Sequence, residues 1–157
     1  MLFRSRGRTP RAEVARILDA ARDAGVDLID TAAAYGEAEQ ALAALDARGR
    51  GFRVASKTAR IAGGLDAVVS RAQDSVARLG RPLDALLVHS AQDLLTPDGP
   101  ALWGALERMR AAGDVGRIGI SFYASDAIIE MAERFRPQVV QIAASFVDQR
   151  QIGRAHV

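Results

Sequence analysis

The sequence predicts an α/β fold in which parallel strands are joined by crossover helices. Segments with helical and strand patterns alternate along the 157 residues, giving five helix-then-strand units. These units follow one another at spacings of about 25 to 33 residues, which suits parallel strands because each pair needs a long crossover. Hydrophobic residues make up 49% of the chain and charged residues 25%, as in an ordinary folded domain. We therefore expect one domain of this class.

The first unit shows how the elements are recognised. Thr9 and Pro10 predict a helix N-cap followed by proline at the first helical position, and Gly25 supplies a stop. Between them, apolar residues recur at the spacing of one helix face: Val14, Ile17, Leu18 and Ala21. Residues 26–31 are a short apolar run broken by Asp27, and they predict the first strand.

The remaining four units follow from the same patterns, with Gly80, Gly113 and Pro137 as breaks between elements. Helices are expected over residues 36–48, over residues 65–79, from the turn at 96–100 to Ala112, and from Ser125 or Asp126 to Phe135. Strands are expected over residues 52–58, 83–89, 117–121 and 139–145.

Two architectures use this alternation, an open doubly wound sheet and a closed eight-stranded barrel. The open sheet would normally bind a nucleotide through a glycine-rich first turn. No G-x-G-x-x-G motif is present, and Gly63-Gly64 is not followed by the G-K-[ST] of a P-loop. We therefore predict a partial (β/α)8 TIM barrel with about five parallel strands, since a complete barrel needs about 250 residues.

Composition and charge exclude several classes of protein. The chain has no cysteine, which excludes disulfide scaffolds, thiolate metal sites and cysteine nucleophiles. Its 21 basic and 19 acidic residues alternate without a basic block, so nucleic-acid binding is not expected. The apolar runs are well short of the roughly 20 residues of a membrane helix, so no membrane role is expected. A cytoplasmic location fits this composition.

Residues with acid-base chemistry stand at the ends of consecutive predicted strands. Asp30, Lys57 and His89 end the first three, and Tyr35 follows the first, at the edge where barrel enzymes place their active sites. Lys57 is the only lysine among 21 basic residues, and an ammonium is a compact point charge that guanidinium cannot replace. Each residue alone has a structural explanation, as a helix cap, loop packing, a strand-end charge or a core histidine. Their joint placement favours a functional site.

These residues lie in segments that resemble the aldo-keto reductase family, which comprises NAD(P)H-dependent carbonyl reductases built on a (β/α)8 barrel. The resemblance runs from about residue 9 to residue 150. Residues 30–36 are its most specific part, because they match the family's Asp-Thr-Ala-x-x-Tyr-Gly segment. Further similar segments are residues 55–58, 86–89, 116–121, 140–141 and 148–150.

The resemblance implies a catalytic tetrad of Asp30, Tyr35, Lys57 and His89 and the reduction of an aldehyde or ketone by NADPH, with NADH as the open alternative. Tyr35 would give a proton to the carbonyl oxygen of a small-molecule substrate. A cationic Lys57 would stabilise the phenolate that remains. Asp30 would pair with Lys57, and His89 would orient the carbonyl oxygen by a hydrogen bond. The oligomeric state does not follow from the resemblance.

The family pattern also implies that Ser121 and Gln141 hydrogen-bond the nicotinamide carboxamide. The family usually has asparagine after this serine, where the chain has Phe122, and asparagine is also common at the position of Ser145. One amide contact is therefore expected to be absent or to be met by another group. Phe122 and Tyr123 are candidates to pack in the pocket instead.

Compared with the family, the first strand and the last two strands are expected to be missing. Residues 1–8 are expected to be a leader, residues 9–151 the partial barrel, and residues 152–157 a non-native tail that resembles a translated sequencing adapter. In the family, the loops of the last two strands bind the pyrophosphate and adenosine 2′-phosphate of the cofactor. The expectation is that a fragment of this kind binds cofactor poorly and is inactive alone.

Three other functions stay open at this point. One is a non-catalytic or inert barrel fragment, or a regulatory interaction subunit of the same fold. Another is an aldolase or isomerase that uses Lys57 as a Schiff-base amine. Nucleic-acid binding is the third and has the least support. The complete set of four tetrad residues favours the reductase, whereas the strands expected to be missing favour the inert fragment for this chain.

Overall fold

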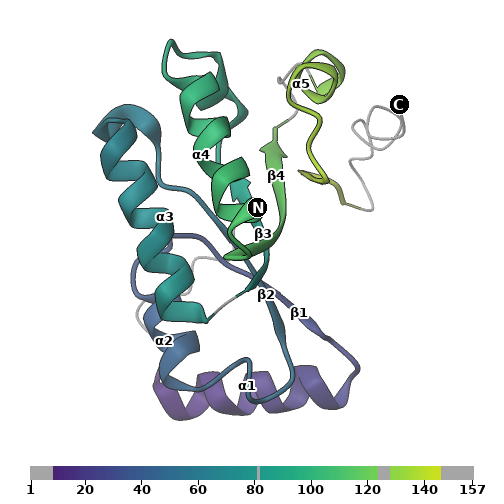
Figure 1. The fold of residues 1–157 in the computed structure, drawn as a ribbon. Helices are drawn as coiled ribbons and strands as arrows, with labels where there is room; N and C mark the ends of the chain where they lie inside the picture. Colours follow the sequence, from purple (N-terminus) through teal and green to yellow (C-terminus); the bar gives the residue numbers. More distant parts are fainter. Residues whose placement is uncertain (1–8, 81, 124–127, 146–157) are drawn as a thin grey trace.

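The computed structural model describes residues 9–80, 82–123 and 128–145 (Figure 1). Its helices are α1 (Arg11–Asp23), α2 (Ala38–Ala44), α3 (Leu65–Leu79), α4 (Gly99–Ala111) and α5 (Ile128–Phe135), with short 3-10 turns at Ile61–Gly63 and Ala91–Leu95. Its strands are β1 (Leu28–Asp30), β2 (Arg53–Lys57), β3 (Leu83–Val88), β4 (Val115–Phe122) and β5 (Val139–Ile142).

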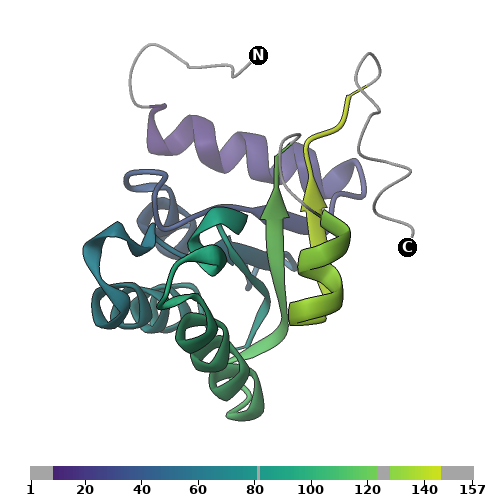
Figure 2. The ribbon, with the colours of Figure 1, turned by 90° about the horizontal axis from the view of Figure 1, so that it is seen from above.

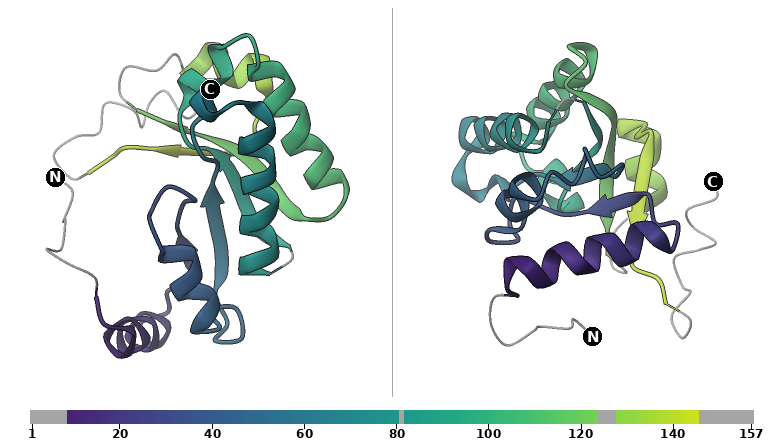
Figure 3. Two further views of the ribbon diagram at one scale, coloured as in Figure 1. Left: turned by 90° about the vertical axis from the view of Figure 1, so that its left-hand side faces the viewer. Right: turned by 90° about the horizontal axis from the view of Figure 1, so that it is seen from below.

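All five strands are parallel and lie in the order β1-β2-β3-β4-β5, which is also their order in the sequence. The sheet curls, and α2, α3 and α4 pack on its outer face (Figures 2 and 3). No described helix covers the concave face. This arrangement confirms the predicted partial (β/α)8 barrel. No helix in the described ranges is both long enough and apolar enough to cross a membrane.

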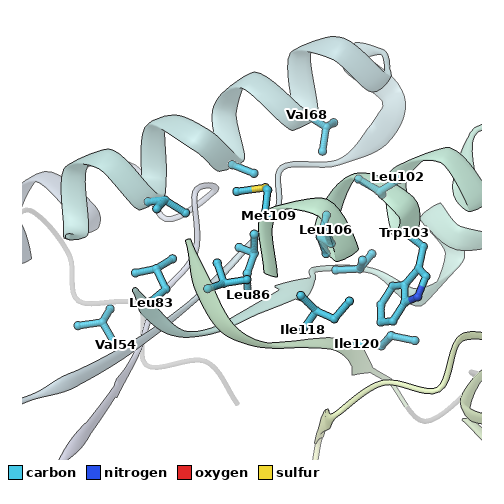
Figure 4. Close-up of a cluster of buried hydrophobic side chains, with 14 of the residues drawn as sticks. Val54, Val68, Leu83, Leu86, Leu102, Trp103, Leu106, Met109, Ile118 and Ile120 are labelled. Carbon is cyan, nitrogen blue, oxygen red and sulfur yellow. The ribbon is translucent and has the colours of Figure 1, made fainter. Parts of the chain in front are cut away.

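The hydrophobic core lies between the sheet and the outer helices. Figure 4 shows that strand residues such as Leu86 and Ile118 meet Leu106 and Met109 of α4. A smaller apolar cluster of Ala55, Ala85 and Leu87 lies on the other face of the sheet. Because successive strand residues point to opposite faces, this pattern places every second residue of β2 to β4 on the concave side.

Most predicted boundaries shift by a few residues. The predicted Thr9 N-cap is wrong: Pro10 occupies the N-cap position, no side chain caps the helix, and α1 begins at Arg11. Strand β4 begins earlier than expected because Val115 pairs with Leu83, whereas β5 ends at Ile142. The expected start of the fifth helix at residues 125–126 lies outside the described residues, as do the predicted leader and tail.

Charged side chains join β2, β3 and β4 near the N-terminal ends of these strands, away from the edge where the site is expected. Asp84 of β3 accepts a hydrogen bond from Arg53 of β2 at 3.0 Å and forms an ion pair with Arg117 of β4. Burial raises the pKa of Asp84, but the two arginines outweigh it, so this pKa is lowered overall. This network ties β2, β3 and β4 together at the end of the barrel that serves stability.

Gly119 allows β4 and β5 to approach each other closely. It is paired with Val139, and a Cβ atom at Gly119 would lie 2.1 Å from the Val139 carbonyl oxygen. We expect Gly119→Ala to lower the free energy of unfolding by about 1 to 2 kcal/mol, because the edge strand β5 must move away. Urea unfolding measures this. Gly63→Ala is the control, since nothing lies within 4 Å of its new Cβ; equal losses in both variants would contradict the clash.

Candidate active site

The predicted tetrad residues come together at the C-terminal edge of the sheet. Asp30 is the last residue of β1, Lys57 is the last residue of β2, and His89 directly follows β3. Tyr35 lies in the loop between β1 and α2. Neighbouring parallel strands end at the same edge, so residues that are far apart in sequence become neighbours here.

Lys57 is a buried cation whose hydrogen-bond donors all have acceptors. Its side chain is 2% exposed, and its Nζ donates to Asp30 Oδ2 at 2.6 Å, Asp30 Oδ1 at 2.7 Å and the Thr31 carbonyl oxygen at 3.0 Å. An ammonium has three donors, so its hydrogen-bonding capacity is filled. Burial of a charge without such partners would be costly. With all three donors engaged, the amine is held in place, and this disfavours its use as a free Schiff-base nucleophile.

Tyr35 contacts both Lys57 and His89. The Lys57 Nζ lies 5.3 Å from the centre of the Tyr35 ring, within the range of a cation–π interaction. The Tyr35 and His89 rings meet edge to face, with their centres 5.7 Å apart and their planes at 85°. Tyr35 is 49% exposed, so a small molecule can reach it. The geometry therefore gathers a phenol, an ammonium and an imidazole around one accessible point.

Backbone hydrogen bonds bring the Tyr35 loop back over β2. The Thr31 N–H donates to the Ala55 carbonyl at 2.9 Å, and the Ala33 N–H donates to the Lys57 carbonyl at 3.1 Å. These bonds continue the pairing with β2 beyond Asp30, the last residue of β1. Gly36 follows Tyr35 with φ of 59°, a conformation that favours glycine and turns the chain toward α2.

His89 is held in an environment that favours its neutral form. Its backbone N–H donates to Thr58 Oγ1 at 3.3 Å, and its Nδ1 is buried without a hydrogen-bond partner among the described residues. Burial lowers the pKa of His89, and the positive charge of Lys57 lowers it further. A neutral imidazole has one N–H donor and one acceptor nitrogen, so it can hydrogen-bond a polar oxygen without carrying charge.

The lowered pKa of His89 predicts how stability changes with pH. Below the ordinary histidine pKa of 6.5, the unfolded chain binds more protons than the folded chain, so the free energy of unfolding falls as the pH drops. We expect His89→Gln to show a flatter decline below pH 6.5, measured by urea unfolding across this range. His156 is present in both proteins and cancels in the comparison. An identical decline in both would contradict the lowered pKa.

Ser121 and Gln141 are neighbours in the register of β4 and β5. The Ser121 hydroxyl donates to Gln141 Oε1 at 3.2 Å, and both side chains lie on the concave side of the sheet. Together they offer a hydroxyl and an amide NH₂, which can bond the carbonyl and amino groups of a carboxamide. Their chemistry therefore fits the nicotinamide carboxamide that the family resemblance implies.

Phe122 does not line this site. It is 1% exposed and packs in the hydrophobic core, because the residue after Ser121 points to the helix side of the sheet. The prediction that Phe122 packs in the pocket is therefore wrong. Tyr123, in contrast, is 55% exposed.

A cavity of about 620 Å³ opens beside the tetrad, between β1, α1 and α2. Asp30, Thr31 and Tyr35 line it together with mainly apolar residues. Lys57, His89, Ser121 and Gln141 are not among its lining residues, so this cavity reaches only the Asp30 and Tyr35 side of the site. Within the described ranges, no cluster of three or more histidine, aspartate or glutamate residues is arranged to hold a metal ion.

Glu39 and Ser56, whose side chains meet behind β2, are not among the site residues predicted from the sequence. Glu39 stands in an alanine-rich helical segment, where a glutamate has no feature that singles it out. Its burial is visible only in the structure, where Glu39 and Leu42, three residues apart, form the buried face of α2.

Comparison with known proteins gives one family. The model of the Aldo/keto reductase family matches residues 1–154. No curated protein sequence matches the chain. Three solved structures illustrate the similarity. A Pseudomonas aeruginosa protein assigned to the aldo-keto reductases shares 25% identity at a TM-score of 0.73, covering 92% of this chain and 60% of its own.

The other two structures have similar sequence identities, coverages and TM-scores. The holo form of aldo-keto reductase AKR11C1 from Bacillus halodurans has 21% identity and a TM-score of 0.72, covering 93% of this chain and 53% of its own. A mutant of Gox0644 in complex with NADPH has 23% identity and a TM-score of 0.70, covering 94% of this chain and 55% of its own. The chain thus spans less than two thirds of the length of these structures.

Proposed function

Because the chain belongs to the aldo/keto reductase family, we propose that its site reduces an aldehyde or ketone with hydride from NADPH, with Tyr35 as the proton donor. One observation carries this proposal. The buried, Asp30-bound ammonium of Lys57 lies 5.3 Å from the centre of the exposed Tyr35 ring. A phenol that must release a proton has its activating cation beside it.

The first task of the site is to position the carbonyl oxygen. The ring centres of Tyr35 and His89 lie 5.7 Å apart, so both side chains are close enough to contact one small substrate. The neutral imidazole of His89 would donate a hydrogen bond to that oxygen. This bond polarises the carbonyl group and holds it for attack at carbon.

The second task is proton transfer. As negative charge develops on the carbonyl oxygen, the Tyr35 hydroxyl would donate its proton to it, leaving a phenolate. Lys57 stabilises that phenolate by its positive charge. Asp30 keeps the ammonium in place through hydrogen bonds to both of its carboxylate oxygens. General acid catalysis of this kind contributes a factor of about 10² to 10⁴ in rate.

When bound, the reduced nicotinamide supplies the hydride to the carbonyl carbon. Ser121 and Gln141 would hold its carboxamide, and this contact fixes which part of the ring faces the substrate. NADPH is preferred in this proposal because one of the similar structures is described as a complex with NADPH.

The direct test follows NADPH oxidation by the protein with a panel of small aldehydes and ketones. Because a partial barrel is expected to bind cofactor poorly, the assay uses NADPH at high concentration. The tetrad residues gathered at one edge then lead us to expect slow oxidation that depends on the carbonyl compound and, with NADPH deuterated at C4, one deuterium on the alcohol carbon. Borohydride trapping provides the opposite test, because Lys57 is the single lysine of the chain. A carbonyl adduct at Lys57 would indicate Schiff-base chemistry and contradict the reductase proposal.

A further inference from the structure

A buried carboxylate lies behind the strand that carries Lys57. The Glu39 side chain is 4% exposed and accepts three hydrogen bonds: from Ser56 Oγ at 2.7 Å, from Ser75 Oγ at 2.9 Å and from Arg78 at 2.9 Å. Ser56 contacts Oε1, whereas the two α3 residues contact Oε2. Both oxygens are therefore satisfied, and Glu39 joins α2, β2 and α3 at one buried point.

Ser56 links this carboxylate to the candidate active site. It directly precedes Lys57 on β2, and adjacent strand residues point to opposite faces of a sheet. Ser56, which is 0% exposed, therefore points to the helices while Lys57 points to the concave side. The pairing with β1 and β3 orients β2, and the hydrogen bond to Glu39 holds its helix-facing side directly behind Lys57.

The Tyr35 loop is attached to the same helix. Arg71 of α3 donates to the Ala33 carbonyl at 3.1 Å, while the Ala33 N–H is bonded to the Lys57 carbonyl. Helix α3 therefore holds the Lys57 strand through Glu39 and the loop before Tyr35 through Arg71. The strand that carries Lys57 and the loop that carries Tyr35 are therefore both anchored to α3.

We propose that Glu39 is a positioning residue, which acts through Ser56 to hold the Lys57 ammonium against Asp30 and Tyr35. A carboxylate suits this task because its hydrogen bonds are shorter and stronger than those between neutral groups. The proposal rests on the proposed function only for the role of the ammonium, which is to stabilise the Tyr35 phenolate. How firmly the ammonium is held can be measured without enzymatic turnover.

Two serine variants form a matched pair for the test. Ser56→Ala and Ser75→Ala each remove one hydroxyl donor to the same carboxylate, but only Ser56 lies next to Lys57. Labelling with ¹⁵N-lysine gives a single side-chain signal, since the chain has one lysine. The hydrogen-exchange rate of its ammonium then reports how firmly Lys57 is held.

We expect Ser56→Ala to accelerate this exchange about tenfold, which corresponds to the free energy of roughly one hydrogen bond. Ser75→Ala should leave the rate unchanged. Urea unfolding of both variants checks that exchange is compared in folded protein. Equal exchange rates in the two variants would overturn the proposal, whether both are raised or both match the wild type.

A second pair applies if Ser56→Ala does not fold. Ser56→Thr and Ser56→Val have the same shape and differ only in the hydroxyl group, so Thr should retain slow exchange and Val should not. Equal rates in this pair would overturn the proposal as well. Absence of carbonyl reduction together with the expected exchange rates would instead reject the proposed function and leave the positioning role intact.

Discussion

Replacing Tyr35 with phenylalanine is expected to lower kcat/KM for carbonyl reduction by a factor of about 10² to 10⁴. The variant keeps the aromatic ring, so the edge-to-face contact with His89 and the position over Lys57 can remain. It removes only the hydroxyl that would protonate the carbonyl oxygen. Stability should therefore change little, because the side chain is half exposed. Steady-state kinetics with NADPH and a small aldehyde measure the loss.

Tyr123→Phe is the control for this variant. Tyr123 is the second tyrosine of the chain and is exposed to a similar extent, beyond the end of β4. It should retain activity within about threefold, since it is assigned no role in proton transfer. Retained activity in Tyr35→Phe, or an equal loss in both variants, would assign the proton donor to another group.

Replacing Asp30 with alanine is expected to lower the free energy of unfolding by about 2 kcal/mol. The change leaves the Lys57 ammonium buried with the Thr31 carbonyl as its remaining acceptor. Loss of one partner of a buried ion pair is strongly destabilising, because a charge stays in the interior without compensation. The expected loss is smaller here than for a fully buried pair, since Asp30 is 41% exposed and water can take part of its place.

A double-mutant cycle separates the ion pair from the packing of each side chain. Lys57→Met keeps an unbranched side chain of similar length and removes the charge that Asp30 balances. The double variant Asp30→Ala/Lys57→Met should therefore be more stable than the sum of the single losses predicts, by about 1 to 2 kcal/mol. Strictly additive losses would mean that the carboxylate does not stabilise the ammonium in the folded chain.

Hydrophobic periodicity and glycine positions determine which elements could be predicted. Helix α3 has its predicted bounds because its apolar stripe is enclosed by Gly64 and Gly80, both with φ near 90°. Strands β1 and β5 are shorter than their apolar runs, because strand length is set by pairing with a neighbour as well as by composition. The sequence of one segment does not contain that information.

The same distinction applies to the site. Asp30, Lys57 and His89 could be predicted because the ends of parallel strands meet at one edge, whatever the details of packing. Glu39 could not, because a glutamate on a short helix is usually solvated, and only the tertiary structure brings Ser56, Ser75 and Arg78 to it. Phe122 shows the opposite error, since its position next to Ser121 suggested a contact that strand alternation prevents.

The order of the strands has a consequence for how the chain is made. Each strand pairs with the one that precedes it in sequence, so a segment leaving the ribosome finds its partner already synthesised. Every βα unit can then be added to the growing edge as translation proceeds. Lys57 can meet Asp30 when β2 pairs with β1, so the ion pair can form before the later strands have joined the sheet.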